Sequence, residues 1–188
     1  MGLGNYEDSL MRRVTSSSQL SCALLELIGL TMWIGGIAII LVAVIPAVFN
    51  TLGMETGGRF LRRIFDSYNM LTSGVVLLLI STAGFRAWKG KHTQEHALPV
   101  KRTELGLLVS LLIVTVCIVL VLGPKAVELQ EAAFAAESQD MKKVAYDAFF
   151  RTHMIVRALH LINAGLAVSL LIVKFRQWVR AGRILGFE

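Results

Sequence analysis

Charged residues are scarce in this chain. Only 17% of its 188 residues are charged, whereas a soluble domain carries about a quarter. The deficit comes from long apolar runs, and the first of them, residues 27–49, contains no charged side chain. At about 1.5 Å per residue, a helix over this run is longer than the roughly 30 Å hydrocarbon core of a bilayer. The sequence therefore predicts an integral membrane protein.

Cysteines are few, and the motifs of common enzymes are absent. Cys22 and Cys117 lie in or at the edge of apolar runs, so no disulfide framework is predicted. The sequence contains no phosphate-binding loop, dinucleotide fingerprint or nucleophile elbow. His92 and His96 match an H-x-x-E-H metalloprotease spacing, but they lie in a short basic loop that contains Pro99. We therefore expect the protein not to be an enzyme and to have no catalytic residues.

Four apolar runs predict an all-α integral membrane fold, a four-transmembrane-helix antiparallel bundle. The predicted spans are about 22–49, 68–88, 103–123 and 148–175. They form a membrane domain at 20–176, between a polar leader at 1–19 and a basic tail at 177–188. We find no repeat of fixed period.

Two prolines and one loop add local detail. Pro46, near the end of the first span, predicts a kink. Gly123-Pro124 predicts a helix start, because proline is favoured at the first helical position. Residues 125–147 are acidic and rich in alanine, which favours an extramembrane helix in the third loop.

The basic residues flank the apolar runs. The formal charge is +6. The placement of the basic residues indicates that they set the membrane topology and contact lipid headgroups, and we expect no binding to nucleic acid. The side that holds both termini and the middle loop carries 11 Lys and Arg residues, and the other side carries 7. The positive-inside rule then predicts that both termini are cytoplasmic and that the third loop faces outward.

Few ionisable residues lie within the spans, and such residues are functional candidates by default. Glu26 precedes the charge-free part of the first span. Arg157 lies near the opposite boundary, more than about 12 Å away from Glu26 in depth. Glu26 should therefore pair with Arg86 or Lys174, which lie at its own depth.

His153, Arg157 and His160 are spaced to share one face of the fourth span. In one interpretation His153 and Arg157 anchor at the outer headgroups, and His160 makes an interhelical hydrogen bond. In another, His153 binds a metal with Met54, Asp66, Asp147 or Met154, and such a set suits copper. Bis-histidine haem ligation is not expected, because no other span contains histidine.

Several short motifs resemble known membrane families. Glu26 stands seven residues before Trp33, which begins a Trp-x-Gly-Gly run. This segment is distantly similar to the copper-resistance protein D membrane domain, in which a histidine holds the position of Glu26. This resemblance implies copper handling. Because Glu26 replaces the histidine, one of the copper ligands is missing in this sequence.

A second resemblance is closer and covers about residues 20–175. It rests on Pro46-Ala47-Val48-Phe49, the basic helix from Gly58 to Phe65, Gly123-Pro124, and Phe149 four residues before His153. These features resemble domain of unknown function 4149, a small four-helix family that includes eukaryotic transmembrane protein 205. His153 is the polar position that this resemblance carries over.

Two functions are compatible with the sequence. The first is a non-catalytic accessory or structural subunit that packs, within the lipid bilayer, against other membrane subunits or against itself. The second is a copper or other soft-metal transport or tolerance protein that uses the His153 and His160 face. No other cofactor is expected.

Overall fold

The computed structural model describes the backbone of residues 3–92 and 100–184 and the side chains of residues 20–91 and 100–179. Within these residues the structure is helical and contains no strand, which confirms the all-α prediction. The elements are α1 (Leu3–Ile39), η1 (Ile40–Val44), α2 (Ile45–His92), α3 (Arg102–Val116), η2 (Cys117–Leu122), α4 (Gly123–Ala135) and α5 (Gln139–Ile184). Those named η are short π-helical turns.

Three helical stretches in the described part of the chain are long and apolar enough to cross a membrane. They are Leu20–Lys91, Arg102–Ala135 and Gln139–Val179. The first stretch is far longer than a bilayer requires, at 72 residues. Its length is explained by a reversal of direction near its middle.

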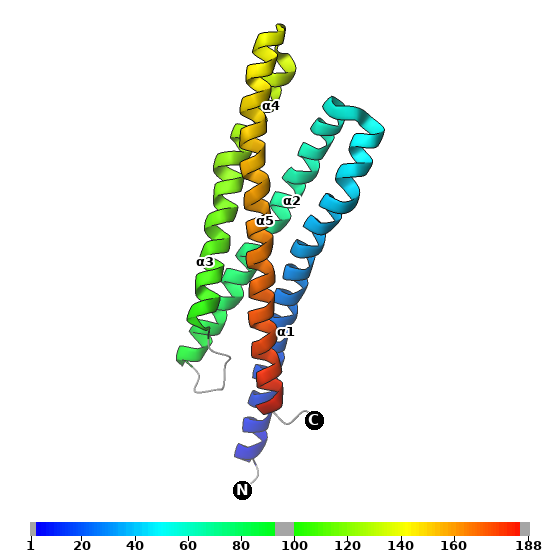
Figure 1. Cartoon of the computed structure of the whole chain (residues 1–188). Helices are drawn as coiled ribbons and strands as arrows, with labels where there is room; N and C mark the ends of the chain where they lie inside the picture. Colours follow the sequence, from blue (N-terminus) through cyan, green and yellow to red (C-terminus); the bar gives the residue numbers. More distant parts are fainter. Residues whose placement is uncertain (1–2, 93–99, 185–188) are drawn as a thin grey trace.

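Gly53 is the point at which this first stretch turns back. It has φ 70° and ψ −172°, a conformation that is essentially restricted to glycine. The hydrogen bond from the Tyr68 hydroxyl to the Trp33 carbonyl joins the two arms across the turn. Residues 20–91 therefore form an antiparallel helical hairpin, called here the first hairpin (Figure 1).

Each π-helical turn is followed by a proline. Pro46 lies just after η1 and Pro124 just after η2. A proline has no N–H to donate to the carbonyl four residues earlier, and its ring crowds that carbonyl. The helix widens locally to π geometry, and this is the form that the predicted kink at Pro46 takes. At η2 a Cβ on Gly123 would lie 2.9 Å from the Ile118 carbonyl oxygen, so the turn requires glycine there.

The third loop differs from the prediction of a single extramembrane helix over 125–147. α4 begins at Gly123, as Gly123-Pro124 predicts, but it ends at Ala135. α5 begins at Gln139 and continues without interruption through the predicted fourth span. Ala136 has an extended backbone, and the Ser138 hydroxyl accepts a hydrogen bond from the Met141 N–H, as an N-cap does. A short break therefore divides this region between two helices.

α3, η2, α4 and α5 form the second hairpin, residues 102–179. Helix packing runs around the bundle from α1 to α2, α3, α5 and back to α1. The first residues of α1 and the last residues of α5 lie at one end, where α2 ends and α3 begins, and α4 lies at the other end (Figure 1).

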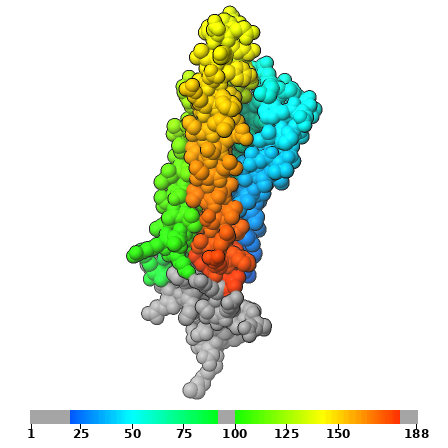
Figure 2. All heavy atoms as spheres, in the orientation of Figure 1, coloured from blue at the N-terminus to red at the C-terminus, as the bar shows by residue number. Residues whose placement is uncertain are grey.

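A dry apolar layer fills the middle of the bundle. Its fully enclosed members come from all four arms: Leu30, Trp33, Leu79, Leu111, Ala167 and Leu170. α5 runs the length of the molecule between α3 and the first hairpin (Figure 2). Large apolar side chains also cover the outside, as expected of helices that face lipid.

Candidate functional site

Four charged side chains meet inside the bundle, one from each arm. They are Glu26 of α1, Arg86 of α2, Glu104 of α3 and Lys174 of α5, and together they are called the charge ring. Lys174 Nζ lies 2.8 Å from Glu26 Oε2 and 2.7 Å from Glu104 Oε1. Arg86 Nη2 lies 3.4 Å from Glu26 Oε1 and forms a second ion pair with Glu104. Each carboxylate therefore contacts both bases, and each base contacts both carboxylates.

The charge ring is closed to the surroundings. None of its four side chains is more than 7% exposed. Thr82 donates a hydrogen bond of 2.6 Å to Glu26 Oε1, and Gln177 Nε2 donates one of 3.3 Å to Glu104 Oε2. Arg86 Nε is buried and has no hydrogen-bond partner among the described residues.

Such a ring holds helices together through its formal balance of two positive and two negative charges. Moving a single ion from water into an apolar interior costs several kcal/mol, and only close, well-bonded partners offset that cost. Because the partners come from different arms, separating any arm would leave an uncompensated buried charge. The arrangement therefore fixes how the two hairpins meet.

Glu26 has the partners that the sequence predicts, and it contacts both Arg86 and Lys174. Glu104, by contrast, is not among the functional candidates that the sequence predicts. This residue lies at the start of the third predicted span, beside Lys101 and Arg102, where it resembles an ordinary boundary charge. One feature of the sequence does point to Glu104. It stands at the start of its apolar run, as Glu26 stands at the start of the first one.

A second set of polar groups lies on the other side of the apolar layer. Asn163 Nδ2 donates a hydrogen bond of 3.1 Å to Thr115 Oγ1 and joins α5 to α3. Asn163 Oδ1 is buried and has no partner in the described part of the chain. The His160 ring is buried near two aromatic rings, with centroids 5.6 Å from Phe65 and 5.9 Å from Tyr68.

The predicted roles of the α5 histidines are only partly matched. His160 packs against the rings of Phe65 and Tyr68, and the expected interhelical hydrogen bond stays a prediction. His153 stacks on Phe149 with centroids 5.5 Å apart, and Arg157 is exposed. The three residues follow one another along α5, but only His160 is enclosed by the bundle.

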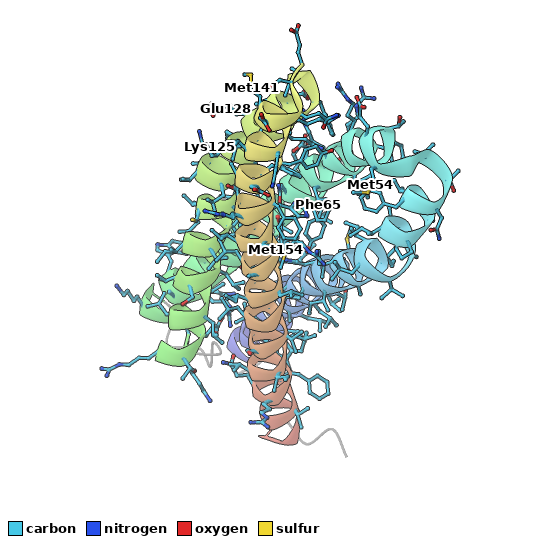
Figure 3. The ribbon with its side chains drawn as sticks, turned by 45° about the horizontal axis from the view of Figure 1, so that its top comes forward. Met54, Phe65, Lys125, Glu128, Met141 and Met154 are labelled. Carbon is cyan, nitrogen blue, oxygen red and sulfur yellow. The ribbon has the colours of Figure 1, made fainter. Side chains whose placement is uncertain are left out.

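The described residues contain no group of three or more His, Cys, Asp or Glu side chains placed to hold a metal ion. Of the thioethers considered as copper ligands, Met54 lies beside the Gly53 turn and Met154 lies on α5, so they belong to different hairpins (Figure 3). Both are exposed. The motif from His92 to His96 falls largely outside the described residues.

The end of the bundle opposite the charge ring is also held by charges, but these are only partly buried. Arg62 pairs with Glu131 at 2.6 Å, and the Arg59 guanidinium lies 5.1 Å from the Phe134 ring centroid. These contacts join α4 to the part of α2 that follows the Gly53 turn. Lys125 and Glu128 pair near the start of α4 at 3.1 Å (Figure 3).

These features define an all-helical, membrane-type protein whose interior charges pair with one another. A family model described as a domain of unknown function (DUF4149) matches residues 28–135. The match covers more than half of the chain, and the protein belongs to this family. No curated protein and no solved structure matches the chain. The distant likeness to copper-resistance protein D stays a prediction.

Replacing Glu104 with glutamine tests the charge ring. Glu104→Gln keeps the shape of the side chain but leaves two buried bases with one carboxylate. We expect the free energy of unfolding in detergent to fall by about 3–5 kcal/mol. The control is Glu128→Gln, which breaks an exposed pair and should change stability little. Equal stability of the two variants would show that the ring contributes no more than a surface pair.

Proposed function

We propose that the protein is a non-catalytic, four-span membrane protein that serves as an accessory subunit of a larger membrane complex. One observation carries this proposal. Among the described residues, the four buried Glu, Arg and Lys side chains all pair with one another in the charge ring. Polar chemistry inside the bundle thus serves its assembly, and the surfaces that remain for partners are the outer helix faces.

The outer faces suit both lipid and other helices. They carry large exposed apolar side chains on every arm, among them Ile39, Leu77, Ile113 and Leu161. Between them are glycines at which an added Cβ would meet no other atom within 4 Å, including Gly74, Gly106 and Gly165. Small residues on an outer face allow a neighbouring helix to approach closely, and close packing drives helix association in lipid.

The proposed topology places each arm of both hairpins across the bilayer. The start of α1, the end of α2, the start of α3 and the end of α5 then lie on the cytoplasmic side, and α4 lies on the opposite side (Figure 1). The larger number of Lys and Arg residues at the first end supports this orientation. The Gly53 turn supports the count of four spans, because it divides the first long helical stretch into two arms.

Cysteine labelling in intact cells tests the topology. In a background with Cys22→Ser and Cys117→Ser, Glu128→Cys on α4 should react with a membrane-impermeant maleimide added outside. Lys91→Cys, which is also exposed, should react only after the cells are permeabilised. Labelling of Lys91→Cys alone in intact cells would show that the orientation is the opposite one. Labelling of both positions in intact cells would contradict the four-span topology.

Purification from the native membrane tests the accessory role. The tagged chain, extracted in a gentle detergent, should co-elute with other membrane proteins in a fixed ratio, as mass spectrometry would measure. A tagged four-span protein of another family, purified in the same way, serves as the control for background. A chain that elutes alone at every detergent concentration would contradict the proposal.

Elemental analysis of the same sample tests the copper alternative. We expect no stoichiometric copper, because no group of three or more His, Cys, Asp or Glu side chains in the described residues is placed to hold a metal ion. Near-stoichiometric copper that is lost in His153→Ala, with the fold retained, would favour the metal-handling function instead.

A further inference from the structure

The two hairpins share an arrangement that extends beyond their charges. We infer that the membrane domain consists of two copies of one hairpin module, related by a pseudo-two-fold axis through the charge ring, and that the ring is the surface by which one module recognises the other. The partner that fits this surface is a hairpin of the same pattern.

The rising arms are α1 in the first hairpin and α3 in the second, each followed by its π-helical turn. They correspond at an offset of 78 residues. Glu26 corresponds to Glu104, and Pro46, 20 residues later, corresponds to Pro124. The π-helical turn Ile40–Val44 corresponds to residues 118–122, which lie within η2. The buried residues between them also correspond: Leu30 with Leu108, Trp33 with Leu111, Ile37 with Thr115, and Ile40 with Ile118.

The descending arms are the part of α2 after Gly53 and, in the second hairpin, α5. They correspond at an offset of 88 residues. Arg86 corresponds to Lys174, so the basic member of the ring occupies the same position in each hairpin. The buried positions before it match as well: Thr72 with His160, Val75 with Asn163, Leu79 with Ala167, and Thr82 with Leu170. The change from 78 to 88 means that the second hairpin has a longer tip, which contains α4. The two halves are therefore not related by a repeat of fixed period.

Helical periodicity alone would give any two bundle helices similar burial patterns. It does not require an acid at the same position on both rising arms, a proline 20 residues beyond each acid, a π-helical turn before each proline, or a base at the same position on both descending arms. The positions of the acids, the prolines and the bases are independent of one another, whereas each π-helical turn follows from its proline. Together they distinguish a repeated module from two ordinary amphipathic hairpins.

The packing obeys the same symmetry. Exchanging the hairpins maps α1 onto α3 and α2 onto α5. The contact of α1 with α5 then becomes the contact of α3 with α2, and both contacts are present. Within the ring, the pair Glu26–Arg86 maps onto Glu104–Lys174, and Glu26–Lys174 maps onto Glu104–Arg86. Both hairpins run in the same direction, as in parallel membrane repeats whose axis lies along the membrane normal.

The middle of the second hairpin departs from the repeat. Thr115, His160 and Asn163 are polar, whereas Ile37 and Val75 are apolar and Thr72 is a smaller polar residue. The hydrogen bond between Asn163 and Thr115 joins two arms of the second hairpin alone. The charge ring is therefore the polar feature that both modules share, which fits a role in their mutual recognition.

Charge inversion in the full-length protein tests this inference. Glu26→Lys with Arg86→Glu inverts the first hairpin alone. It keeps opposite charges within that hairpin and places like charges across the interface with the second. Adding Glu104→Lys and Lys174→Glu restores opposite charges at all four contacts. The readouts are the monodisperse fraction in size-exclusion chromatography and the Tm in detergent.

We expect the first-hairpin inversion to lose most of the monodisperse fraction and the full inversion to recover at least half of it. Equal behaviour of the two variants, whether both are stable or both are lost, would overturn the inference.

A milder exchange provides an independent test. If Arg86 and Lys174 occupy equivalent positions, Arg86→Lys combined with Lys174→Arg should have a Tm at or above those of the two single variants. A Tm of the exchange variant below both would also overturn it.

Discussion

Glu26 and Glu104 are enclosed by apolar helices, and either carboxylate would be strongly destabilising there without a base in contact. Arg86 and Lys174 supply those bases, and each comes from a different helical arm than the acids. The rest of the fold is arranged to make this meeting possible. The turn at Gly53 returns α2 beside α1, and the long α5 returns from the opposite end so that Lys174 reaches the depth of Glu26.

Next to the charge ring, packing is apolar. Leu30, Trp33, Leu79 and Leu170 are enclosed in the interior, and their side chains have no polar group that would specify a partner. In lipid, apolar burial gives helices little reason to prefer one neighbour over another, because the surrounding tails are equally apolar. The ring therefore supplies specificity, and the apolar layer supplies close contact. The π-helical turns before Pro46 and Pro124 then lead each rising arm into its tip.

Much of this structure could be predicted from local sequence. The charge-free run after Glu26 predicts a membrane helix, Gly123-Pro124 predicts the start of α4, and equal depth predicts the pairing of Glu26 with Arg86 and Lys174. Glu104 was missed because its neighbours in sequence make it look like a boundary residue, and its burial depends on α5 packing over it. The aromatic surroundings of His160 were also missed, since Phe65 and Tyr68 are brought to it by the first hairpin. Contacts between hairpins depend on tertiary arrangement, which residue spacing does not contain.

The central claim is that distant arms are joined by direct charge pairing inside the bundle. A double-mutant cycle between Glu26 and Lys174, with Glu26→Gln and Lys174→Met measured singly and together in detergent, tests it most directly. The account predicts a coupling free energy above about 1 kcal/mol, with the double variant more stable than additivity of the single variants would give. Additive effects of the two substitutions would contradict the account, because they would mean that these side chains do not interact in the folded protein.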